Sequence, residues 1–122
     1  MKENIIQQKT YSFALEIIQL YKTLTKQNEY ILSRQILKSG TSIGANIEET
    51  IGAYSTAEFL SKISISYKEA RETHYWLRLL KDSGYIEESL FKKLIFDCDE
   101  IFKIIGKIQI TTKANQKELK KS

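Results

Sequence analysis

Apolar side chains recur at intervals of three and four residues along four stretches of the chain, which is the spacing of one face of an α-helix. The stretches cover about residues 10–25, 33–52, 56–83 and 87–112. Short connections separate them, so consecutive helices are expected to run antiparallel. The pattern predicts an all-α protein, an up-down-up-down four-helix bundle within residues 1–112.

Each predicted helix has one continuous apolar face, which is expected to form the core. Small residues interleave with the large apolar ones, and a cysteine within such a face usually behaves as a small hydrophobe. The predicted core residues are Phe13, Ile17, Leu20 and Leu24; Leu32, Ile36, Ile43, Ile47 and Ile51; Phe59, Ile63, Ser66, Ala70, Thr73, Leu77 and Leu80; and Phe91, Leu94, Cys98, Ile101, Ile105 and Ile108.

The centre of the second stretch, residues 39–45, is poor in side chains. Gly40 and Gly44 each cost a helix about 1 kcal/mol relative to alanine, which favours a turn. Their spacing of four residues also places both on one helix face, where a neighbouring helix can approach closely. We favour a helix whose packing offsets the penalty, with a turn as the alternative.

Helix ends carry local signals of their own. Asn28 or Ser33 is expected to cap the second helix. Ser55 followed by Glu58 has the spacing of a capping box at the start of the third helix. Gly84 is placed where a left-handed residue would end that helix.

Composition narrows the class of protein. A chain of 122 residues without proline and with a single cysteine fits one helical domain without disulfides. The first residues lack a signal-peptide pattern, and no apolar run is long enough to cross a membrane, so a cytoplasmic protein is expected. The net charge is +4, and residues 113–122, with four lysines and one glutamate, are expected to form a basic flexible tail.

Few residues could support catalysis. His74 is the only histidine and Cys98 the only cysteine, which excludes the usual zinc patterns and leaves a Cys98–His74 dyad as a weak alternative. Acidic residues on three helices could bind metal, but no Glu-x-x-His motif accompanies them. These carboxylates are Glu48, Glu49, Glu69, Glu72, Asp97, Asp99 and Glu100. We therefore expect no enzyme, no metal and no cofactor.

Aromatic residues on the third and fourth helices exceed what one narrow core requires. A surplus of this kind at the edge of a small domain indicates an interface, and identical chains usually bury such patches by cyclic closure. A homo-oligomer is the prediction, with a generously filled monomer core as the alternative. The interface candidates are Tyr67, Tyr75, Trp76, Phe91 and Phe102.

Basic residues form a second theme, interleaved with these aromatics. Clustered cations beside aromatic rings are typical of surfaces that bind nucleic-acid phosphates. A solvated charged face is the alternative. The candidate binding residues are Arg34, Lys38, Lys68, Arg71, Arg78, Lys117, Lys120 and Lys121.

Residues 39–49 resemble the signature of a family of four-helix bundle proteins encoded in intervening sequences of 23S ribosomal RNA, once labelled ribosomal protein S23. The family motif Ser-Ile-x-x-Asn-Ile-x-Glu matches Ser42, Ile43, Asn46, Ile47 and Glu49. Further similar segments are 58–60, 68–77 and 84–86, so the resemblance spans roughly residues 8–112. One departure is Thr50, where the family often has glycine.

The resemblance implies an antiparallel four-helix bundle that commonly assembles into a pentamer with a central channel. It also implies a helical centre for the second stretch and a distant similarity to accessory proteins of diversity-generating retroelements. A polar layer is expected, in which Ser42, Asn46 and Glu49 of the second helix face Glu72 and Thr73 of the third. A layer of this kind would fix the register between the two helices.

Together these features predict a non-enzymatic, ring-forming homo-oligomer, a pentamer by preference. It would serve as a binding or scaffold module for RNA or for a protein that processes nucleic acid. The alternative is a protein adaptor that binds no nucleic acid. Fold alone does not decide between them.

Overall fold

The computed structural model describes residues 2–121 of the chain, with side chains described for residues 5–120. This part of the chain forms four α-helices and no strand. They are α1 (Lys2–Lys26), α2 (Leu32–Ile51), α3 (Thr56–Asp82) and α4 (Glu88–Lys121). The predicted all-α class is confirmed. None of these helices combines the length and apolar character needed to cross a membrane.

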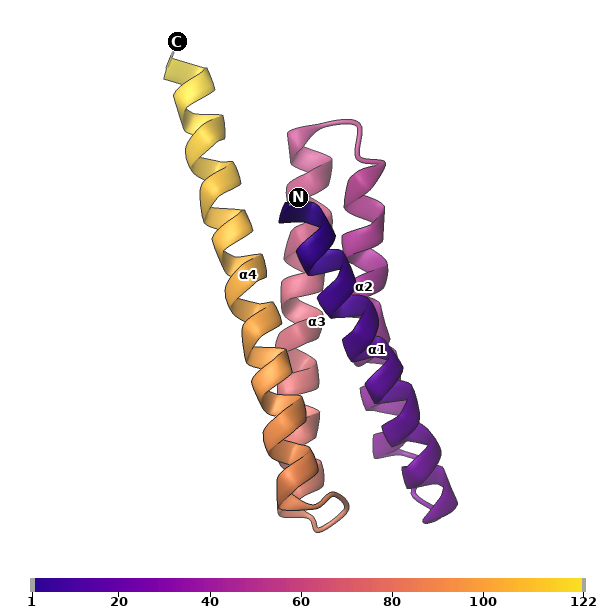
Figure 1. The fold of residues 1–122 in the computed structure, drawn as a ribbon. Coiled ribbons are helices and arrows are strands. Elements are labelled where there is room, and N and C mark those ends of the chain that lie inside the picture. Colours follow the sequence, from indigo (N-terminus) through magenta and orange to yellow (C-terminus); the bar gives the residue numbers. More distant parts are fainter. Residues whose placement is uncertain (1, 122) are drawn as a thin grey trace.

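Consecutive helices run antiparallel and pack in chain order, and α1 also packs against α4 (Figure 1). The result is an up-down-up-down arrangement. The α4 helix diverges from α3 towards its C-terminal end, and its last turns extend past the start of α1 (Figure 1). The α1–α4 pair is the least extensively packed of the four, so this side of the bundle is the more open one.

The predicted apolar faces form the core. Nearly all of the predicted positions on α1, α3 and α4 are buried, as are Ile36, Ile43 and Ile47 of α2. Leu32, Phe59, Phe91 and Ile108 are partly buried against the same cluster. The prediction for Ile51 is wrong, because this side chain is 61% exposed where α2 ends.

Residues 39–45 are helical, as preferred over the turn. A Cβ atom added to Gly40 would lie 2.8 Å from Ile17 Cγ2, and one added to Gly44 would lie 3.3 Å from Thr10 Cβ. Both glycines thus face α1, and the missing side chains let the two helices approach closely. This contact explains how α2 tolerates two glycines in its interior.

Two helices extend beyond their predicted ends. The α1 helix begins at Lys2 instead of residue 10. The polar run Gln7-Gln8-Lys9 masks the pattern there, although Ile6 is buried in the core. The α4 helix continues to Lys121 instead of ending at residue 112. Lysine, alanine, glutamine and glutamate are strong helix formers, so helicity outlasts the apolar periodicity.

Caps between the helices agree only in part with the sequence signals. Asn28 adopts a left-handed conformation, with φ of 63°, just beyond the end of α1, so it does not cap α2. Glu29 performs that role instead of Asn28 or Ser33, because its carboxylate accepts the backbone N–H groups of Ile31, Leu32 and Ser33.

The start and end of α3 follow the prediction more closely. Ser55 Oγ accepts the Glu58 N–H at 3.1 Å, as a capping box requires. The Glu58 carboxylate reaches back to the N–H of Tyr54 at 3.2 Å instead of that of Ser55. Gly84, with φ of 82°, has the predicted left-handed conformation beyond the end of α3.

Candidate nucleic-acid interface

The predicted cations of α3, namely Lys68, Arg71 and Arg78, are all exposed. The Cζ atom of Arg71 lies 5.8 Å from the ring centre of Phe102 on α4. The Cζ atom of Arg78 lies 5.8 Å from the ring centre of Tyr75 on its own helix. Both distances are those of a cation–π contact. We call Lys68, Arg71, Tyr75, Arg78 and Phe102 the basic-aromatic surface.

The rings beneath the arginines are held by other side chains. Phe102 packs edge-to-face on Tyr67 with ring centres 4.7 Å apart. Tyr75 packs on Trp76 at 5.0 Å, and the Trp76 indole N–H donates to the Glu72 carboxylate at 3.1 Å. A guanidinium lying over a fixed ring loses fewer conformations when its N–H groups bind a ligand.

The predicted basic residues on α2 and α3 are not neutralised within the described part of the chain. Arg34, Lys38, Lys68, Arg71 and Arg78 form no ion pair there. Four other lysines do. The pairs are Lys9 with Glu100, Lys62 with Glu49, Lys81 with Glu88 and Asp82, and Lys93 with Glu16. The hydrogen bond and charge of Glu49 raise the pKa of Lys62.

The cations of α2 and of the C-terminal segment take no part in the cation–π contacts of this surface. Lys38 is close enough to Glu69 of α3 to oppose the rise in that carboxyl's pKa, which burial and the neighbouring Glu72 cause. Lys117 and Lys120 are exposed on the last turns of α4. The side chain of Lys121 lies outside the described residues.

The Cys98–His74 alternative is not supported by geometry. Cys98 is fully buried, and its thiol donates to the Ala70 carbonyl oxygen at 3.5 Å. Burial, reinforced by Asp99 and Asp97, raises the thiol pKa to about 12, which leaves it protonated and unreactive at neutral pH. His74 Nε2 instead lies 3.3 Å from an Asp99 carboxylate oxygen.

The predicted polar layer between α2 and α3 is wrong in its register. Thr73 donates to Ser39 Oγ at 2.8 Å, so this part of α3 lies beside the N-terminal half of α2. Asn46, by contrast, donates to the backbone oxygen of Ser42 in its own helix. Glu49 pairs with Lys62, far along α3 from Glu72 and Thr73.

A different polar contact joins the two helices. Ser66 Oγ donates to the Ile43 carbonyl oxygen at 2.9 Å, and both atoms are buried. Together with the Thr73–Ser39 bond it ties α3 to α2 at two levels. Serine and threonine at predicted core positions indicated that buried hydrogen bonds form here. Periodicity alone does not show which residue of α2 each of them contacts.

The carboxylates do not gather into a metal site. No group of three or more histidine, cysteine, aspartate or glutamate side chains within the described residues could hold an ion. Most of the acidic candidates instead have partners among amides, lysines, the indole and the imidazole. The contacts are Glu48 with Gln7, Glu49 with Lys62, Glu72 with Trp76, Asp99 with His74 and Glu100 with Lys9.

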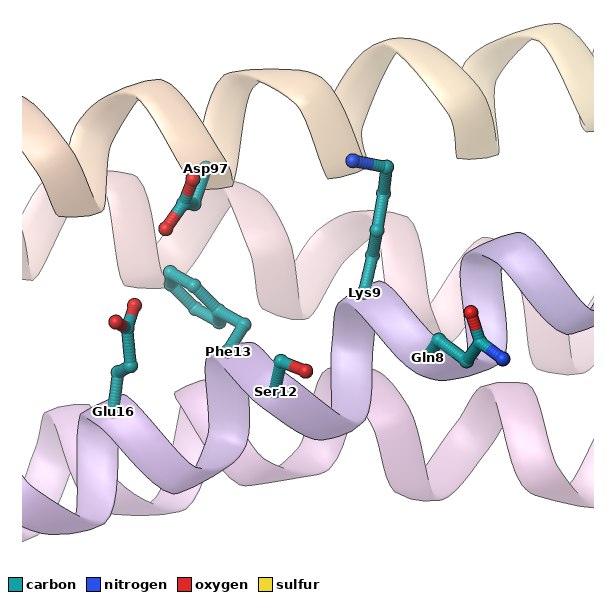
Figure 2. A pocket seen from close by; sticks show the side chains of 6 residues that line it. All are labelled: Gln8, Lys9, Ser12, Phe13, Glu16 and Asp97. Atoms are coloured by element: carbon teal, nitrogen blue, oxygen red, sulfur yellow. The ribbon is translucent and has the colours of Figure 1, made fainter.

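A shallow polar pocket of about 320 Å³ lies between α1 and α4 (Figure 2). Glu16 and Asp97 border it at one end and Lys9 and Gln8 at the other, with Phe13 between them (Figure 2). Two of its three charged side chains form ion pairs across the two helices, Lys9 with Glu100 and Glu16 with Lys93. These ion pairs join α1 to α4 beside the pocket.

The predicted interface aromatics are less exposed than their number suggested. Tyr67, Trp76, Phe91 and Phe102 are partly buried, whereas Tyr75 is 47% exposed. Sequence reasoning missed two more exposed apolar side chains on α1, Tyr11 at 68% and Leu15 at 50%. The signal was a second stripe at helical spacing, from Tyr11 through Leu15 to the partly buried Ile18.

Fold and site together define a class: a small antiparallel four-helix bundle with a cationic and aromatic outer surface. Within the residues that the structure describes, the single cysteine is buried and no group of three or more metal-ligating side chains could hold an ion.

The family model of the 23S rRNA-intervening sequence protein matches residues 2–107, so the chain belongs to that family. A solved structure of a protein with unknown function, from the S23 ribosomal protein family of Bacteroides thetaiotaomicron VPI-5482, is 45% identical. The match covers 89% of this chain and 98% of that one, with a TM-score of 0.87. No curated protein matches the chain. The family predicted from residues 39–49 is thus confirmed.

Proposed function

We propose that the protein is a non-enzymatic, homo-oligomeric binding module that contacts RNA phosphates through its basic-aromatic surface. One observation carries the proposal: Arg71 and Arg78 lie over aromatic rings and have no carboxylate partner in the described structure. An oriented guanidinium matches the geometry of a phosphate, and its free N–H groups can donate to phosphate oxygens.

Oligomerisation would raise the affinity of a surface that is modest in one copy. A chain with few phosphate contacts binds weakly near physiological salt, while several linked copies act together. We propose a ring of five, as the family resemblance implies. Exposed Tyr11, Leu15 and Tyr75 support association between copies, because such side chains gain from burial in an interface.

The test is binding to a fluorescent RNA hairpin, measured by anisotropy over a series of salt concentrations. We expect affinity to fall as salt rises, and Arg71→Gln to weaken binding and reduce the salt slope by about one contact. Arg71→Lys keeps the charge but loses the planar group over Phe102, so it should also weaken binding.

Lys93→Gln is the matched control. It removes the same charge, but from a lysine that Glu16 already neutralises on the α1–α4 side. Its effect should be smaller than that of Arg71→Gln. Equal effects of the two variants, or no binding at low salt, would contradict the proposal.

A second candidate is a protein adaptor that binds no nucleic acid. The exposed apolar stripe of α1 favours it, since Tyr11 and Leu15 suit a protein surface better than a phosphate backbone. This function predicts that partners remain bound in a pull-down after nuclease treatment. Native mass measured with and without nuclease separates the two functions.

A further inference from the structure

An apolar cleft of about 530 Å³ lies among the start of α1, the end of α2, the start of α3 and the C-terminal half of α4. All four helices contribute to it. Its lining is mostly apolar and includes Ile5, Ile6, Ile51, Ile104 and Ile108, with Lys107 among the few polar side chains. The volume falls in the range typical of small-molecule sites.

The cleft is continuous with the core. Ile6, Ile47 and Ile63 are core residues whose side chains are at most 3% exposed, and they also line the cleft. Ile5 and Ile51 also line it and expose 51% and 61% of their surface. A ligand seated here would extend the core outward and remove apolar surface from water.

The polar groups in the lining are mostly satisfied inside the protein. Thr50 Oγ1 donates to the Ile47 carbonyl oxygen at 2.6 Å, and Thr112 Oγ1 donates to the Ile108 carbonyl oxygen at 2.7 Å. Gln7 donates to Glu48 at 3.5 Å. These residues therefore contribute few free donors, and the site favours an apolar chain over a polar molecule.

Lys107 is the exception, because it is the only charged residue in the lining. It forms no ion pair with any residue that the structure describes. No aspartate or glutamate lines the cleft. The charge complement of an apolar cleft with one free ammonium is an amphipathic anion.

The Lys9–Glu100 ion pair, with atoms 3.2 Å apart, joins α1 to α4 about one turn from the lining residues of each helix. Beyond the pair, isoleucines of both helices line the cleft, namely Ile5 and Ile6 of α1 and Ile104 and Ile108 of α4.

We propose that this cleft binds a long-chain carboxylate, with the alkyl chain against the isoleucines and the carboxylate on Lys107. The proposal is independent of the proposed RNA binding, because the cleft shares no lining residue with the basic-aromatic surface. A medium-length fatty acid, dodecanoate, is the probe. Its binding to the full-length protein can be measured by isothermal titration calorimetry below the concentration at which it forms micelles.

We expect saturable binding of one dodecanoate per chain. Dodecyltrimethylammonium, with the same tail and the opposite charge, should bind at least about tenfold more weakly, because it has no carboxylate partner in the lining. Lys107→Gln should weaken dodecanoate binding by about fivefold, which is the largest effect usual for a solvent-accessible ion pair. Lys103→Gln, one turn earlier on α4 and outside the lining, should have no effect.

A second variant tests the chain-binding part without altering charge. Thr111 is exposed and lines the cleft, so Thr111→Trp should fill it without disturbing the core and should abolish dodecanoate binding. Its melting temperature should stay at the wild-type value, which shows that the fold is intact.

Four results would overturn the proposal. The first is no saturable binding, and the second is equal binding of the two amphiphiles. The third is a cleft covered by a second copy: Ile51→Arg would then lower the native mass, and dodecanoate would bind only to the dissociated variant. Unchanged binding to Thr111→Trp would place the ligand elsewhere and also reject this site.

Discussion

The absence of a side chain at Gly40 allows α2 to pack closely against α1. Alanine normally stabilises a helix interior relative to glycine by about 1 kcal/mol. At this position a Cβ would lie 2.8 Å from Ile17 Cγ2, which is too close for a real contact. We expect Gly40→Ala to lower the free energy of unfolding by about 1–2 kcal/mol in urea denaturation, because overpacking outweighs propensity.

Gly106 of α4 is the matched control for this prediction. A Cβ added there would lie 3.9 Å from the Tyr67 ring, an ordinary contact. Gly106→Ala should therefore stabilise the protein by about 0.5–1 kcal/mol. A shift in the same direction for both variants would mean that the α1–α2 contact is not the reason for glycine at position 40.

Cys98 makes stability depend on alkaline pH. Burial raises its pKa from 9.0 to about 12, so the folded protein holds the thiol proton at pH values where the unfolded chain has lost it. The stabilisation is complete below about pH 9 and is lost as the pH rises towards 12, by about 1.4 kcal/mol per pH unit.

Comparison with Cys98→Ala isolates this effect, because the two proteins differ only in the thiol. Unfolding is measured at pH 7.5 and pH 10. The wild type should lose more stability than the variant between the two values. Equal losses would indicate that the thiol ionises while the protein is folded.

Sequence alone predicted which side chains are buried far better than which ones touch. Helical period fixes the face of a residue, and Cys98 and Thr73 are buried as that period requires. The period does not fix how far one helix slides along another. For this reason Thr73 bonds to Ser39, while Asn46 and Glu49, its predicted neighbours, lie elsewhere.

At the scale of the element, the start of α2 depends on the Glu29 side chain. Desolvation raises the pKa of this carboxyl, but hydrogen bonds from the N–H groups of Ser33, Leu32 and Ile31 outweigh it and leave the pKa below 4.5. We expect Glu29→Ala to cost about 1 kcal/mol of stability, as loss of a helix cap usually does.

The same cap should respond to acid. A depressed pKa means that the stabilisation is present above the unfolded value of 4.5 and is lost as the pH falls through the lower folded value. The difference in unfolding free energy between wild type and Glu29→Ala should therefore shrink between pH 6 and pH 3. Gln27→Ala, at a nearby exposed position, serves as control; an equal loss there would argue against the cap.

Helix existence was easier to predict than helix length. Four apolar stripes at helical spacing, separated by short connections, predict four helices and no other kind of element. Their ends depend on side-chain to backbone bonds such as that of Glu29, and on helix formers outside the apolar stripe, as in residues 113–121. Asparagine is common at the start of a helix, but Asn28 instead lies just beyond the end of α1. Its left-handed conformation is also typical of residues that follow a helix.

At the scale of the whole molecule, the basic-aromatic surface and the apolar cleft share no residue, and the cleft lies on the part of α4 that follows Phe102. The residues of the surface were predicted, but their contacts were not. Arg71 and Phe102 belong to two helices, and the apolar pattern of each helix does not give the register between them. The cleft was not predicted at all. It is lined by residues of all four helices, which the periodicity along any one helix cannot bring together.

The proposed association between copies also belongs to this scale, and the outer stripe of α1 tests it. Leu15 is 50% exposed, so Leu15→Lys should leave the circular dichroism spectrum and the core unchanged. If the stripe is the contact, a buried lysine without a partner is costly, and the native mass should fall to that of a monomer. Gln19→Lys adds the same charge at an exposed position one turn further along α1 and should keep the wild-type mass. An oligomer that survives Leu15→Lys would exclude α1 and direct attention to Tyr75, whose 47% exposure makes it the most accessible of the originally predicted aromatics.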